Sequence, residues 1–272
     1  KGRDGGTGPD EVVIGEMDNP VELPRALDGV DTVVHCAGIA HVSGSLGEDD
    51  YRRINTDGTL KLARAAEAAG VRRFVFLSSV RAQSGASAGA VLSEADPAVP
   101  TDAYGRSKLA AEEGLVSICA DWVALRPVLV VGPGVKGNMA LLLRLAGTPV
   151  PLPFAALTAR RSLLSIENLA GAVRATIDTP DRLNRAFIVA DDGALTFPEM
   201  IAALREGLGM SPGLFALPPS LLLVAARIAG LASVVDRIAG QLVVENAALK
   251  GIGWQPLTTT RESLVRMARA QR

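Results

Sequence analysis

The chain has 272 residues, 48% of them hydrophobic and 21% charged, so it is long enough to bury a sizeable core. Its formal net charge of −1 at pH 7 gives no electrostatic basis for binding nucleic acid or an anionic membrane surface. Only two Tyr and two His are present, so a catalytic role that needs either residue type has few candidates.

No secretory signal is visible in the polar, glycine-rich first residues. The most apolar stretch, 214–235, contains Arg227 and a Pro-Pro pair, so we expect a buried helix pair there rather than a membrane span. We therefore expect a cytoplasmic protein. Cys36 and Cys119 lie in apolar runs, and we expect both to be buried packing thiols rather than metal ligands.

Strand and helix patterns alternate along the first two-thirds of the chain, which is typical of a parallel sheet built from βαβ units. The predicted elements are a strand at 11–14, a helix at 20–27, a strand at 31–36 buried on both faces, a helix at 49–69 capped by Gly70, a strand at 73–77, a helix at 103–118 and a strand at 122–131. Pro127 is expected at the end of the last strand or at a bend.

Beyond Gly134 the pattern changes to short helices, prolines and loops. Helices are predicted at 139–147, 167–177, 198–208 and 219–239, with one strand at 186–189. We therefore predict an α/β fold with a doubly wound parallel sheet over residues 1–132. A smaller region follows over 133–272, with some segments returning to the sheet.

Tyr104 and Lys108 are four residues apart at the start of a predicted helix, which places both side chains on one helix face. A free tyrosine ionises near pH 10, and a nearby ammonium lowers that pKa, so the pair indicates proton transfer by Tyr104. Ser79 follows a buried strand, at the carboxyl edge where open α/β sheets bind ligands. A Tyr-x-x-x-Lys pattern alone is also what a surface helix contains, so the preceding strand, Ser-Ser and loop carry the interpretation.

At this point the sequence resembles a known family. VVHCAG at 33–38, YRRINTDGTLKLARAA at 51–66, FVFLSS at 74–79, YGRSK at 104–108 and LRPVLVVGPG at 125–134 are similar, in this order, to blocks of NAD-dependent epimerase/dehydratase proteins. RRSLLSIENLAGAV at 160–173 and GIGWQP at 251–256 continue the resemblance. It implies a Rossmann-like NAD(P)-binding domain, a substrate-binding region after it, and NAD as cofactor, with NADP possible.

The resemblance also implies roles for single residues. Ser79, Tyr104 and Lys108 match the family's catalytic triad, and the lysine also holds the nicotinamide ribose. Residues matching cofactor contacts are Glu16 beside the adenine, Ala37 and Gly38 in the turn along the middle of the cofactor, and the helix residue Asn55, for which we favour a structural role. We also expect Met17 and Pro127 to contact the cofactor.

Substrate contacts are implied as well. Asn138 matches a residue that contacts the nucleotide or diphosphate of the substrate, and Arg161 matches a diphosphate-binding arginine, although Arg160 is an alternative. Ser79 and Arg81 are further expected substrate contacts. We expect no metal site, and we expect His35 and His41 to be packing or hydrogen-bonding residues.

Two departures from the family pattern affect the predicted extent of the chain and the predicted reaction. The family begins with a strand and a G-x-x-G-x-x-G turn that holds the pyrophosphate, whereas GRDGGTG at 2–8 better matches the loop after the second strand, so we expect roughly 30–40 residues to precede Lys1. Dehydratases of the family carry an Asp-Glu pair after the catalytic Ser or Thr, and here Val80 and Arg81 stand there, which disfavours dehydration.

Three functions stay open at this stage. The preferred one is NAD(P)-dependent hydride transfer at C4 of a UDP-sugar, of the 4-epimerase type. The alternatives are an NAD(P)H-dependent reductase of a UDP-4-keto-sugar, and a non-catalytic relative that lacks the dinucleotide loop. Family habit implies a homodimer through helices such as 51–69 and 103–118.

Overall fold

The structure is a computed structural model that describes residues 12–40, 46–135, 137–218, 220–221 and 240–271. The chain divides into two compact units, each formed by several segments. The first unit comprises Lys1–Gly85, Asp96–Arg126 and Val173–Phe187, and the second comprises Ala86–Ala95, Pro127–Ala172 and Ile188–Arg272. The sequence suggested a division near residue 132 with some later segments returning to the sheet, and in the structure each unit contains several separate segments of the chain.

A four-stranded sheet forms the centre of the first unit. Its strands, in spatial order, are β3 (Thr32–His35), β4 (Arg73–Leu77), β5 (Trp122–Pro127) and β9 (Arg185–Val189). β3 and β5 both pair in parallel with β4, and Phe74 stands opposite Val33 on one side and Trp122 on the other. β5 ends at Pro127, as expected for a residue that has no N–H to donate to the ladder.

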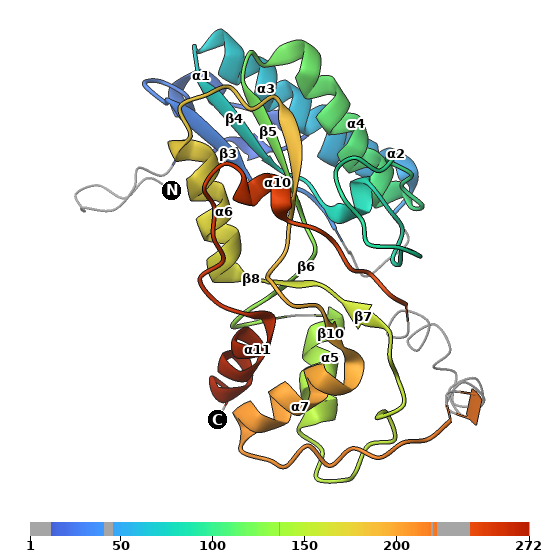
Figure 1. The fold of residues 1–272 in the computed structure, drawn as a ribbon. Helices are drawn as coiled ribbons and strands as arrows, with labels where there is room; N and C mark the ends of the chain where they lie inside the picture. Colours follow the sequence, from blue (N-terminus) through green and yellow to red (C-terminus); the bar gives the residue numbers. More distant parts are fainter. Residues whose placement is uncertain (1–11, 41–45, 136, 219, 222–239, 272) are drawn as a thin grey trace. The chain divides into compact units, whose positions relative to one another are not determined.

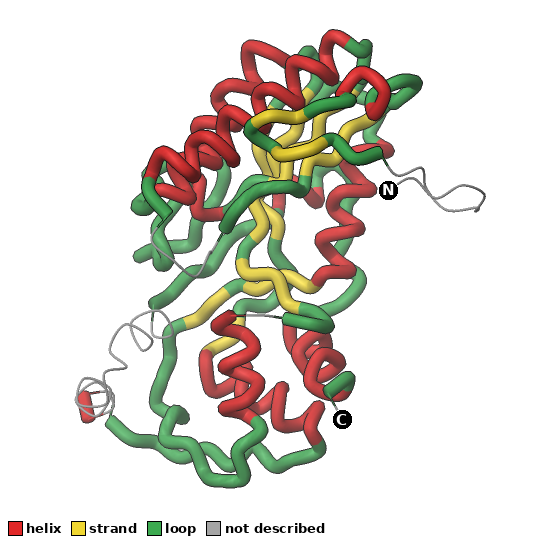
Figure 2. The backbone as a smooth tube through the Cα atoms, turned by 180° about the vertical axis from the view of Figure 1, so that it is seen from behind, coloured by secondary structure: helices red, strands yellow, loops and turns green. Residues whose placement is uncertain are grey.

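Helices flank this sheet, so the predicted α/β class is confirmed (Figures 1 and 2). Those of the first unit are α1 (Leu23–Ala26), α2 (Glu48–Tyr51), α3 (Gly58–Ala68) and α4 (Ala103–Ile118), with the π-helix η1 (Arg52–Asp57) and the 3-10 helix η2 (Val80–Ala82). Figure 1 shows α3 and α4 side by side along the sheet. Leu62 and Leu115 of these helices pack with Phe74 and Phe76 of β4 in one apolar core.

Near the start of the described chain the structure differs from the prediction. Residues 12–14 are not in a strand, and residue 11 lies outside the described residues. A short antiparallel pair, β1 (Gly15–Glu16) and β2 (Asn19–Pro20), follows instead. α1 begins only at Leu23 because Pro20 belongs to β2 and Glu22 adopts a left-handed conformation with φ 59°.

Two further expectations need correction. β3 is not buried on both faces, because Val34 is 36% exposed on this outer strand of the sheet. The predicted helix at 49–69 is interrupted by the π-helix between α2 and α3. The predicted bounds of β4 and α4 are confirmed at both ends.

The second unit contains two small sheets and a helical core. Parallel β6 (Leu129–Val131) and β8 (Leu163–Ser165) form one sheet, and antiparallel β7 (Arg160–Arg161) and β10 (Leu195–Thr196) form the other. The helices are α5 (Gly137–Ala146), α7 (Phe197–Leu208), α10 (Ala247–Lys250) and α11 (Thr260–Arg269), together with the start of α6 (Ile166–Asp178), which continues into the first unit.

The core of the second unit is formed by α5, α7 and α11. α7 and α11 pack at close range, because a Cβ on Gly207 would lie 2.4 Å from the Val265 carbonyl oxygen. The predicted helix at 219–239 falls almost wholly outside the described residues. Within the residues that are described, no helix combines the length and the apolar character needed to cross a membrane.

Candidate active site

Ser79 lies two residues beyond the end of β4 and is the N-cap of the 3-10 helix η2. Its Oγ accepts a hydrogen bond from the Arg81 backbone N–H at 3.2 Å, and the residue is buried. The next helix, α4, begins at Ala103 because the side chain of Asp102 accepts from the Gly105 N–H at 2.7 Å. Tyr104 therefore lies in the first turn of a capped helix.

Gly105 lets α4 approach the segment that carries Ser79. A Cβ at this position would lie 2.2 Å from the Arg81 carbonyl oxygen, so only glycine permits the contact. The close approach brings the phenol of Tyr104 into a hydrogen bond with the side chain of Ser79. The structure thus places these two predicted residues in contact.

Tyr104 is the point at which the expected electrostatics differ. Its pKa is raised above the ordinary value, chiefly because the phenol is withdrawn from water, while the hydrogen bond from Ser79 and the charge of Arg81 act in the opposite direction. We expected a pKa lowered by Lys108. The structure instead leaves Tyr104 protonated at neutral pH.

Lys108 lies one turn further along α4 and is 4% exposed. Its Nζ donates to the Leu77 carbonyl oxygen at 2.9 Å and lies 4.6 Å from the centroid of the Phe76 ring. Burial lowers the pKa of Lys108 to about 8, and the negative charge of Glu112 opposes the shift. The ammonium is thus directed at the backbone at the end of β4.

Asn55 has a structural role in this structure. Its Oδ1 accepts from the Ile39 N–H at 2.8 Å, and its Nδ2 donates to the Ile39 carbonyl oxygen at 2.9 Å and to Ser107 Oγ at 3.1 Å. The amide thus ties the turn after β3 to α4. Gly38 is required in that turn because it has φ 152° and a Cβ would lie 2.8 Å from Asn55 Oδ1.

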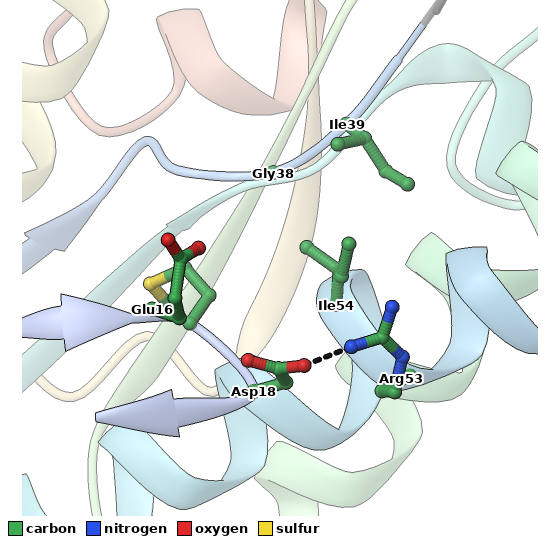
Figure 3. A pocket seen from close by; sticks show the side chains of 7 residues that line it. Glu16, Asp18, Gly38, Ile39, Arg53 and Ile54 are labelled. Carbon is green, nitrogen blue, oxygen red and sulfur yellow. Dashed lines mark hydrogen bonds and ion pairs between the residues drawn. The ribbon is translucent and has the colours of Figure 1, made fainter.

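A cavity of about 500 Å³ lies beside this turn (Figure 3). Glu16, Met17 and Gly38, all predicted as cofactor contacts, line it. Its other lining residues are Asp18, Ile39, Arg53 and Ile54, which sequence reasoning missed. Arg53 and Ile54 belong to the π-helix, an irregularity that helical periodicity does not reveal, and Figure 3 shows Arg53 paired with Asp18.

The remaining predicted contacts lie on several elements. Arg81 is ion-paired with Asp102, and its Nε is buried with no hydrogen-bond partner among the described residues. Arg161, on β7, donates to the carbonyl oxygens of Gly240 at 2.6 Å and Ala86 at 2.9 Å, so backbone groups orient its guanidinium. Asn138 lies on α5, and Ala37 is an exposed residue of the turn after β3.

The histidine and cysteine predictions have mixed outcomes. His35 is buried, contacts Thr59 Oγ1 at 2.9 Å and stacks on Phe76, which confirms a packing and hydrogen-bonding role. His41 lies outside the described residues. Cys119 is buried as expected, but Cys36 is exposed, because it lies just past the end of the outer strand β3. Across the described ranges, no three or more His, Cys, Asp or Glu side chains form a group that could hold a metal ion.

Comparison with known proteins places this geometry in a family. The model of the NAD dependent epimerase/dehydratase family matches residues 2–190, which is more than half of the chain. The chain belongs to this family. The predicted resemblance is thereby confirmed.

Individual members and relatives agree with this assignment. A UDP-glucose 4-epimerase of Vibrio cholerae is 35% identical over 267 residues, covering 94% of this chain and 81% of that protein. A ceramide reductase of Caulobacter vibrioides is 29% identical over 228 residues, covering 83% of this chain and 66% of that protein. The solved structure of MoeE5 in complex with UDP-glucuronic acid and NAD has a TM-score of 0.72 at 25% identity, covering 95% of this chain and 85% of that one.

The cavity beside Gly38 fits part of the family's dinucleotide. The bare backbone of the turn forms one wall, and the carboxylates of Glu16 and Asp18 are hydrogen-bond acceptors. Acceptors of this kind suit the hydroxyl and amino groups of an adenosine, and the Arg53 guanidinium paired with Asp18 offsets part of their negative charge. The carboxylates that line this cavity therefore match the hydrogen-bond donors of an adenosine.

Proposed function

We propose that this chain catalyses NAD-dependent hydride transfer at C4 of a UDP-sugar, of the 4-epimerase type. The observation that carries the proposal is the hydrogen bond between Ser79 and Tyr104 at the carboxyl end of β4, with Lys108 one helical turn away. Membership of the NAD dependent epimerase/dehydratase family and the 35% identity with a UDP-glucose 4-epimerase support it.

Each of the three side chains has a distinct task. For the oxidative step the phenol of Tyr104 must first release its own proton, after which its Oη takes the proton of the sugar hydroxyl and returns it in the reverse step. Ser79 Oγ, already held by the Arg81 N–H, hydrogen-bonds the same sugar oxygen and orients it. The positive charge of Lys108 stabilises negative charge that develops on the oxygens near it. The nicotinamide, when bound, accepts and returns the hydride.

Binding residues follow from the same proposal. Glu16, Met17, Ala37, Gly38 and Pro127 are proposed cofactor contacts, of which the first two and Gly38 line the cavity in Figure 3. Asn138 and Arg161 are proposed contacts of the nucleotide diphosphate, and Arg81, with its buried Nε, is a proposed contact of the sugar. Asn55 serves the cofactor indirectly by fixing the turn at Gly38.

The decisive experiment replaces the phenol oxygen. Tyr104→Phe should lower kcat for interconversion of UDP-glucose and UDP-galactose by at least about 100-fold, because the variant lacks the hydroxyl proposed to accept and return the proton. Turnover is measured by separating the two sugars after incubation with NAD⁺. Substantial residual turnover would contradict the assignment.

Tyr51→Phe is the matched control. The ring of Tyr51 lies 6.3 Å from that of Tyr104, and its hydroxyl donates to the Ala40 carbonyl oxygen at 3.3 Å. Removing this hydroxyl keeps the ring contact, so we expect kcat within about threefold of the unmodified protein. Equal losses in both variants would indicate a general disturbance of the site.

A second candidate is reduction of a UDP-4-keto-sugar with NAD(P)H. The raised pKa of Tyr104 favours it, because a phenol that stays protonated at neutral pH is ready to give its proton to a ketone oxygen. Tightly held NAD⁺ and no net consumption of NADH support the epimerase. Stoichiometric oxidation of NADPH by a 4-keto-sugar supports the reductase, and failure to bind either cofactor supports a non-catalytic relative.

Two properties of the whole protein are also proposed. A cytoplasmic location follows from a nucleotide-sugar substrate, and a homodimer through α3 and α4 agrees with the 64% exposure of Val116 on α4. Analytical ultracentrifugation of the complete protein and of Val116→Glu tests the dimer. A monomer at all concentrations would contradict it.

A further inference from the structure

A chain of buried polar side chains runs behind the catalytic residues. Glu112 of α4 accepts a hydrogen bond from Ser78 Oγ and is ion-paired with Arg126 of β5. Arg126 Nη2 donates to Glu112 Oε2 at 2.6 Å, and Arg126 Nε lies 3.1 Å from each of the two carboxylate oxygens. Arg126 Nη1 donates to Gln83 Oε1 at 2.8 Å. Each of these four residues is less than 9% exposed.

This hydrogen-bond network contacts the segment that carries Ser79 at both of its ends. Ser78 and Gln83 stand at the two ends of the segment that carries Ser79 and η2. Gln83 is itself fixed, because its Nε2 donates to the Asp96 carbonyl oxygen at 3.0 Å and its own carbonyl accepts from the Val99 N–H at 2.8 Å. Glu112 belongs to α4, the helix of Tyr104 and Lys108.

We propose that Glu112 is a positioning residue for the proposed reaction. Its carboxylate holds both ends of the Ser79 segment, directly at Ser78 and through Arg126 at Gln83, against the helix that carries Tyr104. The same carboxylate supplies negative charge one turn from Lys108 and so keeps the ammonium protonated. The inference rests on the proposed function for its catalytic part, whereas the effect on Lys108 is a property of the protein alone.

The surroundings of Lys108 make Glu112 its principal anionic influence among the described residues. The negative charge of Glu112 raises the pKa of Lys108 more than any other charge, and Cys36, just past the end of β3, adds a smaller effect in the same direction. His35 of β3 is neutral near pH 7, because burial lowers its pKa to about 4. Gly38, which lies beside the ammonium, carries no charge.

Glu112→Gln tests both parts of the inference. The amide keeps the size of the side chain and removes its charge, so Lys108 should lose its proton at a lower pH. We expect kcat to fall at least about tenfold, because the geometry between Ser79 and Tyr104 is disturbed. KM should stay within about threefold, because the residues that contact the substrate are unchanged. The alkaline limb of the kcat profile should move to lower pH.

A second measurement reads Lys108 without any substrate. Two-dimensional NMR of the lysine ¹³Cε and ¹⁵Nζ nuclei follows its titration, and the Lys108→Met variant identifies its signal. In Glu112→Gln the midpoint should fall by at least about half a pH unit. If this variant fails to fold, the double variant Glu112→Met/Arg126→Met removes the pair together, which buried pairs tolerate better than loss of one partner.

The matched control is a second buried ion pair, which lies at the other end of β4 and β5 from Ser78 and Arg126. Arg73, the first residue of β4, pairs with Asp121, just before β5, at 2.7 Å, and both are buried. Asp121→Asn breaks a comparable pair at the opposite ends of these strands. It should lower stability but leave the titration of Lys108 and the pH profile of kcat unchanged.

The outcomes separate cleanly. A lowered Lys108 midpoint with a specific loss of kcat in Glu112→Gln supports the inference. An unchanged midpoint, or an equal loss of kcat in Asp121→Asn, overturns it. If the unmodified protein turns over no UDP-sugar, the proposed function fails, and the Lys108 titration still decides whether Glu112 sets the charge of the site.

Discussion

His35 illustrates how one buried side chain can be assigned a protonation state from its neighbours. The Thr59 hydroxyl donates its single proton to the Asn55 carbonyl oxygen at 2.6 Å, so it can only accept from the His35 ring nitrogen 2.9 Å away. His35 is therefore the neutral tautomer with its proton on Nε2. Burial lowers its pKa to about 4, so the ring stays neutral in the folded protein near pH 7.

A pH dependence of stability follows from this residue. The folded pKa lies below the unfolded value of 6.5, so the unfolded chain binds the extra proton between these values, and stability is lost as the pH falls from about 6.5 to about 4. As the pH falls from about 6.5 to about 4, the free energy of unfolding should decrease by about 2–3 kcal/mol less in His35→Gln than in the unmodified protein. Urea denaturation at a series of pH values measures the difference. Parallel curves for the two proteins would contradict the assignment.

Residue types and spacing revealed the reacting groups because their chemistry is local. Tyr104 and Lys108 share a helix face by periodicity alone, and Ser79 had to lie at the strand end that faces them. The raised pKa of Tyr104 was not predictable, because it depends on how deeply the phenol is buried and on Ser79, Asp102 and Arg81 around it.

At the scale of elements, the contact between α4 and η2 determines the site. It depends on Gly105, where any side chain would meet the Arg81 carbonyl oxygen at 2.2 Å. Backbone atoms on both sides leave little room for adjustment. The helix must therefore move away if a methyl group is added, and Tyr104 moves with it.

Gly105→Ala is accordingly expected to cost about 1–3 kcal/mol of unfolding free energy and to lower kcat at least about tenfold. Thermal denaturation and the sugar interconversion assay measure the two effects. The control is Gly89→Ala, where a Cβ meets no atom within 4 Å and no positive φ is required. A Gly105 variant that behaves like the Gly89 variant would show that the close approach is unimportant.

Elements with strong periodicity and clear ends were predictable, and irregular ones were not. β4 is apolar from Phe74 to Leu77, and α4 begins at an Asp cap, so both elements could be located from sequence. The pair β1 and β2 has two residues in each strand, which is too short for alternation to show. The prediction of a strand at 11–14 assigned it to the apolar residues that precede β1.

For the molecule as a whole, each unit has its own stabilising centre. In the second unit, Arg205 is 2% exposed and its guanidinium donates to backbone carbonyls. The acceptors are Ala146, Thr148, Val150, Pro212 and Gly213, at 2.7–3.1 Å. One side chain therefore fixes two loops that are distant in sequence.

Removal of this guanidinium should destabilise the second unit selectively. Arg205→Met leaves several buried carbonyl groups without donors, at a cost of at least about 3 kcal/mol. Hydrogen exchange should show lost protection at 137–152 and 197–215 while β4 and α4 keep theirs. Arg160→Met, at an exposed arginine, is the control. Equal losses of protection in both units would indicate that they unfold together.

At this scale the sequence predicted the order of elements and their α/β class, because periodicity and βα alternation are local signals. The sequence also suggested that some later segments return to the sheet, but it could not predict which ones, since that depends on contacts between distant segments such as 86–95 and 240–245. For the same reason, only three of the seven residues that line the cavity in Figure 3 were predicted.

The π-helix between α2 and α3 gives the site an unusual kind of vulnerability. One extra residue in the turn lets Arg53 and Ile54 face the cavity while Asn55 and Thr56 bond to Ser107 of α4. Deleting one residue of 52–57 would restore a regular helix and rotate everything beyond it by about 100°. A single insertion or deletion in this segment therefore changes the cavity lining by Arg53 and Ile54 and the hydrogen bonds from Asn55 and Thr56 to Ser107 at the same time.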